Sequence, residues 1–187
     1  MSSAVSAFPT VVVTDRLILR PYVRSDVNAL MRLVEMNRIS LRESFAAMAN
    51  GLTGADAIMS FIEVKQEEWN GRSRFCYGIW EQRSKTLLGQ LQVKNVCWEI
   101  PAAEFSYFTT IDYRRQGFAG EAVQGVLDVA FSRLGFRRIA LRIVVGNRPS
   151  IRLAEKLGFQ VEGVHRIEFR CGNGKLHDVC HYAMTCS

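Results

Sequence analysis

The stretch "YRRQGFAGEAVQGVLDVAFSRLGFRR", residues 113–138, changes character at Gly117. From Phe118 onward, apolar residues recur at helical spacing, and together they form one continuous stripe along a helix. The preceding segment, "AAEFSYFTT" (102–110), alternates like a strand. The residues "RRQG" are therefore predicted to form the turn between a strand and the N-terminus of a long helix.

This turn has the features of a phosphate site. A helix N-terminus presents unpaired backbone N–H groups and a partial positive charge of about half an electron. Gly117 lets a ligand approach the backbone, and Arg114 and Arg115 add cationic donors. Read alone, the segment fits equally well a helix start with incidental arginines. The absence of G-x-G-x-x-G and G-K-[ST] loops argues against a dinucleotide fold or a P-loop NTPase.

The remaining elements follow from periodicity and turn residues. The predicted order is β-α-α-β-β-β-α-β-α-β-β, a mixed α/β domain with crossover helices between its middle strands. Strands are predicted at 10–20, 75–81, 87–98, 102–110, 138–145, 160–170 and 177–186, and further helices at 26–36, 54–69 and 149–159.

Composition sets the class of protein. The 187 residues, 48% of them hydrophobic, suit a single domain, which we expect at 10–187 behind a tail at 1–9. The net charge of +6 favours anionic partners, but no basic stripe interleaved with aromatic residues indicates nucleic-acid binding. No apolar run reaches the length of a membrane span. Five cysteines without a C-x-x-C pair, and no secretory signal, predict reduced thiols in the cytoplasm.

A second motif stands downstream of the helix. The stretch "VVGNRPSIRLAEKLGFQVEG" (144–163) places Asn147 between a strand and a short helix. With Arg114-x-x-Gly117-x-Ala119, it resembles the GCN5-related N-acetyltransferase (GNAT) superfamily, whose acetyl-CoA signature is (Q/R)-x-x-G-x-(G/A). The stretches "TDRLILRPY", "YFTTIDYRRQGFAGEA" and "EGVHRIEFRCGNGKLHDVCHYAM" look like its RimJ/RimL branch, the ribosomal-protein N-terminal acetyltransferases. The resemblance implies the GNAT fold, with a V-shaped gap between the fourth and fifth strands.

The resemblance also implies a site for acetyl-CoA, the acyl donor. Backbone N–H groups from Arg115 through Ala119 would hold the pyrophosphate, and the end of the strand would pair with pantetheine amides. The Asn147 side chain would bond the arm from the other side, although a helix cap is the alternative role for it. The implied contacts are Thr109, Thr110, Ile111, Arg114, Arg115, Gln116, Gly117, Phe118, Ala119, Gly120, Asn147 and Ser150.

Acetyl transfer needs an unprotonated amine and a proton for the departing thiolate. The tyrosine acid of many members is absent, because Ala154 stands at its place. The RimL-like pattern implies that Ser150 donates to the thiolate and that Glu168 takes the amine proton. The structural alternatives are a residue in the first turn of a helix for Ser150 and a residue on the solvated face of a strand for Glu168. Glu104 is a second candidate base. His165, His177 and His181 are read as structural, and no metal site is predicted.

The segment expected to wall the acceptor departs from the RimL-like pattern. The chain keeps "NRISL" (37–41), but "RESFAAMANG" (42–51) lacks the expected tryptophan and proline. The predicted function is acetyl transfer to a primary amine by direct attack in a ternary complex, with an acidic protein N-terminus as the favoured acceptor. A small-molecule amine acetyltransferase is the alternative, and a non-catalytic acyl-CoA-binding module is a weaker one. We expect a monomer or a homodimer.

Overall fold

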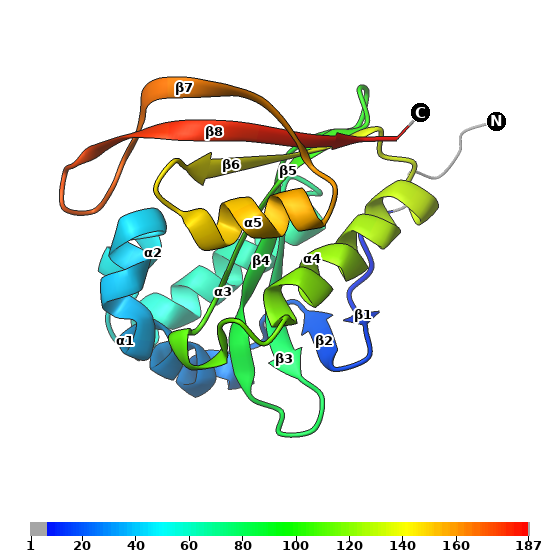
Figure 1. The fold of residues 1–187 in the computed structure, drawn as a ribbon. Helices are drawn as coiled ribbons and strands as arrows, with labels where there is room; N and C mark the ends of the chain where they lie inside the picture. Colours follow the sequence, from blue (N-terminus) through cyan, green and yellow to red (C-terminus); the bar gives the residue numbers. More distant parts are fainter. Residues whose placement is uncertain (1–6, 187) are drawn as a thin grey trace.

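The computed structural model describes residues 7–186, and among them eight strands form one sheet in the order β1-β2-β3-β4-β5-β6-β8-β7 (Figure 1). Neighbouring strands are antiparallel except for β5 and β6, which run parallel. The strands are β1 (Val12–Val13), β2 (Leu17–Arg20), β3 (Phe75–Glu81), β4 (Leu87–Cys97), β5 (Ala102–Thr109), β6 (Arg138–Val144), β7 (Gln160–Arg170) and β8 (Leu176–Thr185).

The two central strands separate along their length. The register of β5 and β6 runs from Ala102–Arg138 to Phe105–Leu141. Beyond that pair, β5 continues to Thr109 beside β4, and β6 continues to Val144 beside β8. Figure 1 shows β6, β7 and β8 turning away from the direction of β3 and β4. A wedge therefore opens in the middle of the sheet, where the GNAT resemblance places it.

Helices cover both faces of this sheet. In Figure 1, α4 and α5 lie in front of the strands and α3 lies behind them. A π-helical turn at Val129–Arg133 continues α4. The helices are α1 (Val27–Ser44), α2 (Ala46–Gly51), α3 (Ala55–Asn70), α4 (Phe118–Asp128) and α5 (Arg148–Lys156).

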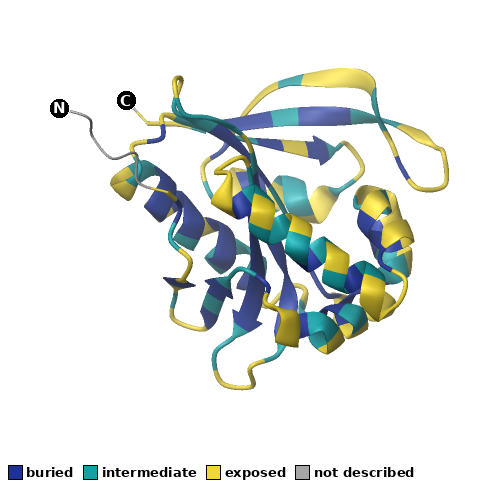
Figure 2. Ribbon diagram, turned by 180° about the vertical axis from the view of Figure 1, so that it is seen from behind, coloured by how far each residue is buried: buried dark blue, intermediate teal, exposed yellow. Residues whose placement is uncertain are grey.

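Two hydrophobic cores hold these layers together. Along β3, Phe75 and Tyr77 belong to the core under α4, whereas Cys76 between them belongs to the core under α1 to α3. Side chains alternate across a strand, so these cores lie on opposite faces of the sheet. Figure 2 shows the same division, with buried residues along the strands and the inner helix faces.

The predicted fold class and element order are confirmed, with local corrections. The expected strand at 10–20 is two short antiparallel strands, because Thr14 accepts the Leu17 N–H and turns the chain. The first helix runs on to Ser44 rather than ending near residue 36, and α2 was not predicted. The longer helix carries Asn37, which forms tertiary hydrogen bonds with Thr110 and Ile111 that sequence periodicity does not reveal.

The expected tail contains a core residue. Phe8 is 2% exposed, and its ring packs 4.7 Å from that of Phe75 and 5.4 Å from that of Phe136. Tyr77 donates a hydrogen bond to the Pro9 carbonyl at 2.7 Å. The packed part of the chain therefore begins before residue 10.

Candidate active site

The turn before α4 is held in a left-handed backbone conformation. Arg115 has φ 60° and Gly117 has φ 85°, a region that glycine enters without steric cost. Arg16, the residue before β2, holds this turn in place. Its guanidinium donates to the Gln116 carbonyl at 3.0 Å, pairs with Glu121 at 2.6 Å and lies 4.3 Å above the Phe118 ring. The start of α4 is thus fixed with its first N–H groups directed outward.

This turn borders a cavity of about 790 Å³, which we call the cofactor cavity. Its lining joins the start of α4 to the end of β5, the start of α5 and the β7–β8 turn. Of the predicted contacts, Thr109, Arg114, Arg115, Gly117, Phe118, Ala119, Gly120, Asn147 and Ser150 line it. Thr110, Ile111 and Gln116 are not among its described lining residues. The cavity lies within the range of 300–1,000 Å³ typical of ligand sites.

Asn37 of α1 explains why two predicted contacts lie outside the cavity. Its buried amide donates to the Thr110 hydroxyl at 2.8 Å and accepts the Ile111 N–H at 3.0 Å. The Thr110 N–H in turn donates to the Leu88 carbonyl at 2.7 Å. Both residues therefore use their N–H groups to fix the end of β5, and Thr109 is the predicted pantetheine partner that reaches the cavity.

The start of α5 forms the opposite wall. The Asn147 carboxamide oxygen accepts the Ser150 N–H at 3.3 Å, so the helix-cap role is present. Asn147 also lines the cofactor cavity. The cap uses the oxygen, and the amide nitrogen at the other end of the group is the atom suited to a ligand carbonyl.

A second cavity of about 320 Å³ adjoins the first, and we call it the acceptor cavity. Its charged lining residues come from separate elements: Arg74 before β3, Lys94 of β4, Glu104 of β5 and Arg142 of β6. Arg74 pairs with Glu68 at 3.2 Å, outside the lining. The cavity wall therefore carries three cations and one carboxylate.

Glu104 lies on this wall and is 7% exposed. Lys94 pairs with one of its oxygens at 3.0 Å, and Asn95 donates to the other at 2.9 Å. These two contacts fix the position of the carboxylate. Of the two candidate bases, Glu104 is the one that lines this cavity.

Glu168, the other candidate base, is not among the described lining residues of either cavity. His181 binds one of its oxygens at 2.6 Å, and Arg142 pairs with the other at 2.9 Å. The hydrogen bond from His181 and the charge of Arg142 lower the pKa of Glu168 below its usual range. Glu168 therefore contacts Arg142, which lines the acceptor cavity, but does not itself line that cavity.

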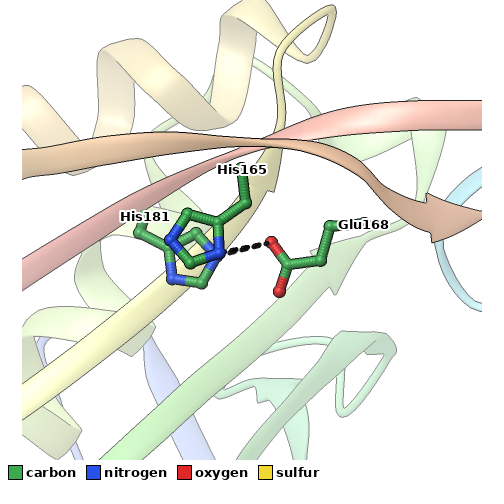
Figure 3. A group of neighbouring side chains, drawn as sticks. All are labelled: His165, Glu168 and His181. Carbon is green, nitrogen blue, oxygen red and sulfur yellow. Dashed lines mark hydrogen bonds and ion pairs between the residues drawn. The ribbon is translucent and has the colours of Figure 1, made fainter.

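The histidines next to Glu168 correct one prediction. The sequence showed no acidic partner for His181, but the β7–β8 pairing places Glu168 beside it (Figure 3). The His181 ring also stacks on the His165 ring, with 3.9 Å between the centroids. A bulge in β7 at Ile167, with φ 55°, shifts the strand register there. The ligand atoms of the three side chains lie within 4.8 Å of one another, a group that could hold a metal ion.

Three side chains that line both cavities carry hydroxyl groups. They are Ser44 at the end of α1, Tyr107 of β5 and Ser150 of α5. Burial raises the pKa of the Tyr107 phenol to about 12, and the neighbouring Ser150 hydroxyl acts in the opposite direction. Tyr107 and Ser150 therefore stand on the two sides of the wedge where the cavities adjoin.

Comparison with protein families identifies the chain. Residues 16–160 match the model of the acetyltransferase (GNAT) domain. The chain is a GNAT acetyltransferase. The match spans both walls of the wedge, from β2 to the start of β7. The GNAT acetyltransferases use acetyl-CoA, and this chain is an N-acetyltransferase.

Individual relatives agree with this family. The chain is 30% identical over 172 residues to the uncharacterized N-acetyltransferase YoaA of Bacillus subtilis (strain 168), covering 92% of this chain and 94% of YoaA. It is 30% identical over 110 residues to spermidine N(1)-acetyltransferase of Vibrio cholerae, covering 59% of this chain and 61% of that protein. The structure of RimL, a ribosomal L7/L12 α-N-protein acetyltransferase in complex with coenzyme A, has a TM-score of 0.85 at 24% identity. That alignment covers 96% of this chain and 98% of RimL.

Several site residues were not found from the sequence. Asn37, Lys94, Tyr107 and Arg142 meet the cavities from four different elements, and each reads as an ordinary helix or strand residue in its local context. Tyr107 stands in a strand, where the alternation of side chains predicts only which face of the sheet it lies on.

No helix among the described residues is both long and apolar enough to cross a membrane.

Proposed function

We propose that this acetyltransferase modifies the α-amino group of a protein or peptide N-terminus whose neighbouring residues are acidic. The observation that supports this choice is the charge of the acceptor cavity, where Arg74, Lys94 and Arg142 outnumber Glu104. Each of these cations also pairs with a carboxylate, of Glu68, Glu104 or Glu168. An acidic peptide would bind the further N–H donors of the two guanidinium groups, whereas a polycation would meet no unpaired carboxylate among the described lining residues. The α-amino group itself asks little of a base, since its pKa of about 7.7–8.0 leaves a large neutral fraction near pH 7.5.

In this proposal the chain binds acetyl-CoA through its own backbone. N–H groups from Arg115 to Ala119 bind the pyrophosphate, and the side chain of Asn147 binds the pantetheine arm. These assignments are supported by the left-handed turn at Gly117 and by the lining of the cofactor cavity. Arg114 and Arg115 add positive charge, which favours the phosphate groups.

Glu104 is proposed to accept the proton of the attacking amine, directly or through a water molecule. Its position on the wall of the acceptor cavity supports this role over Glu168. Glu168 is proposed to orient Arg142 through their ion pair at 2.9 Å. A backbone N–H at the separated end of β5 would stabilise the oxyanion of the tetrahedral intermediate.

A small amine that itself carries an acidic group is the second candidate acceptor. The acceptor cavity of about 320 Å³ lies at the lower end of the range for ligand sites, which suits a compact molecule as well as the end of a peptide. Polyamines fit the charge of this cavity less well, although one relative is a spermidine acetyltransferase.

Thiol release from acetyl-CoA tests the proposal. Three peptides that share an N-terminal serine, followed by acidic, neutral or basic residues, would be compared with spermidine and with an acidic amino-acid analogue. We expect kcat/KM to be highest for the acidic peptide and at least about tenfold lower for the basic one, the ratio that about 1.4 kcal/mol gives. A preference for spermidine or for the basic peptide would contradict the proposal.

A further inference from the structure

The phenol of Tyr107 is an unsatisfied hydrogen-bond donor. Its oxygen is buried and has no partner at normal hydrogen-bond geometry among the described residues, although the Ser150 side chain lies close enough to lower its pKa. The indole nitrogen of Trp80 is the other described side-chain atom in this condition, and Trp80 is not among the described lining residues of either cavity. A buried donor without a partner costs free energy, so its retention at a ligand site indicates a partner that arrives with the ligand.

The position of Tyr107 indicates which ligand atom that partner is. Tyr107 packs with the core on the α4 and α5 side of the sheet, and the parallel pairing of β5 with β6 ends at Phe105, two residues earlier. Tyr107 therefore stands at the beginning of the wedge, opposite Ser150 at the start of α5. The residues that line both cavities are Ser44, Phe45, Tyr107, Val144, Asn147 and Ser150. The scissile thioester has to lie at this junction if the amine occupies one cavity and the pantetheine arm the other.

We propose that Tyr107 is the general acid of the reaction, and this inference rests on the function proposed above. The amine nitrogen forms a bond to the thioester carbonyl carbon, and the carbon–sulfur bond breaks with its electron pair passing to sulfur. The Tyr107 O–H gives its proton to that sulfur. Glu104 takes the proton lost by the amine and returns it through water to the Tyr107 phenolate, so the products are the N-acetylated acceptor and the free thiol.

Tyr107 suits this role better than Ser150 because a phenol is a far stronger acid than an alkyl hydroxyl. The raised pKa of Tyr107, about 12, keeps it protonated over the working pH range. A thiolate that forms in the same dry surroundings is a stronger base than in water, because burial disfavours the charged form. Burial is likewise the largest cause that raises the pKa of the Cys76 thiol to about 12. Ala154, at the place of the tyrosine acid in other members, is fully buried and has no proton to give.

The test compares Tyr107→Phe with Ser150→Ala and with Tyr182→Phe. Tyr182 carries a buried phenol on β8 and donates to Glu155 at 3.2 Å outside both cavities, so it controls for the loss of a hydroxyl. We expect Tyr107→Phe to lower kcat by about 100-fold or more, within the range of general acid catalysis, with the Kd for coenzyme A unchanged. Tyr182→Phe should stay within about threefold of the wild type, and Ser150→Ala should lose less than Tyr107→Phe.

A fluorinated tyrosine at position 107 tests the acid role through the pH dependence of kcat, which a purely structural role of the side chain would leave unchanged. It keeps the shape of the side chain and lowers the phenol pKa, so the alkaline limb of the kcat–pH profile should shift to lower pH. An unchanged limb, or a Tyr107→Phe enzyme with the kcat of the wild type, would overturn the inference.

The proposed acceptor can fail separately from this inference. A wild-type enzyme that prefers another amine would refute the acceptor while leaving the ratio of wild type to Tyr107→Phe measurable on that amine. The acceptor-independent hydrolysis of acetyl-CoA expels the same thiolate, so Tyr107→Phe should also hydrolyse acetyl-CoA more slowly than the wild type. Equal hydrolysis rates in the two enzymes would count against Tyr107.

Discussion

The cofactor cavity and the acceptor cavity share lining residues that include Tyr107 and Ser150, but one is framed mainly by backbone and the other by side chains. The first is framed by the backbone of one turn and two helix starts, at Gly117 and Asn147. The second is framed by charged side chains from separate places along the chain, Arg74, Lys94, Glu104 and Arg142. A backbone site recognises a group common to all reactions of the family, whereas a side-chain site can be changed one residue at a time.

The largest effect is expected from a β-branched side chain in the cofactor turn, which would disturb its backbone. Gly117→Val cannot adopt φ 85° without strain, and its Cβ would lie 3.2 Å from the Arg16 guanidinium. We expect coenzyme A binding, measured by calorimetry, to weaken by at least about 30-fold, because hydrogen bonds to a charged group contribute about 1.5–3 kcal/mol each.

Gly135→Val is the matched control for that substitution. Gly135 has φ 68°, and a Cβ there would meet no atom within 4 Å. It should lose stability from the same backbone strain, by about 1–2 kcal/mol, and keep its affinity for coenzyme A. Equal losses of affinity in both variants would mean that the turn does not bind the cofactor.

The two candidate bases offer the next largest effect. Glu104→Gln should lower kcat by at least about tenfold without changing the Kd for coenzyme A, because the carboxylate at the acceptor cavity is lost. Glu168→Gln should lower kcat less, because it acts only through Arg142. Steady-state kinetics on the same peptide would reverse the assignment if Glu168→Gln were the slower enzyme.

The cations of the acceptor cavity should affect binding more than turnover. Arg142→Met is expected to raise KM for an acidic peptide by about fivefold and to leave KM for a neutral peptide unchanged. Arg138→Met is the control, since Arg138 lies on the same strand and pairs with Glu162 outside the described cavity linings. An equal change for both peptides would remove the electrostatic basis of acceptor choice.

The smallest effect concerns stability against acid. The pKa of Glu168 is lowered in the folded state by the His181 hydrogen bond and the Arg142 charge. The stabilisation from a lowered carboxyl pKa is present above the unfolded value, near 4.3, and disappears as pH falls through the folded value. The difference in Tm between wild type and Glu168→Gln should therefore shrink below about pH 4. A difference that grows with acidity would show that the contacts of Glu168 do not lower its pKa.

The same contrast explains which parts of the site the sequence could predict. Backbone recognition needs a glycine and a helix start next to each other, so the Gly117 turn and the Asn147 cap are visible in short stretches. The acceptor wall depends on strand register, which places Lys94 opposite Glu104. The association of His165, Glu168 and His181 depends on a bulge in β7 that no local pattern indicates. In the sequence, Asn37 stands out only as the first residue of "NRISL". Its contacts were not predicted, because its partners Thr110 and Ile111 lie more than 70 residues away.

The measurement that tests the central claim most directly is mass spectrometry of one peptide after incubation with the enzyme and acetyl-CoA. The peptide would have a free N-terminal serine, two acidic residues after it and a single lysine near its C-terminus. We expect one added acetyl group, located on the α-amino nitrogen. Acetylation of the lysine side chain, or an unmodified peptide alongside an amine that is acetylated efficiently, would contradict it.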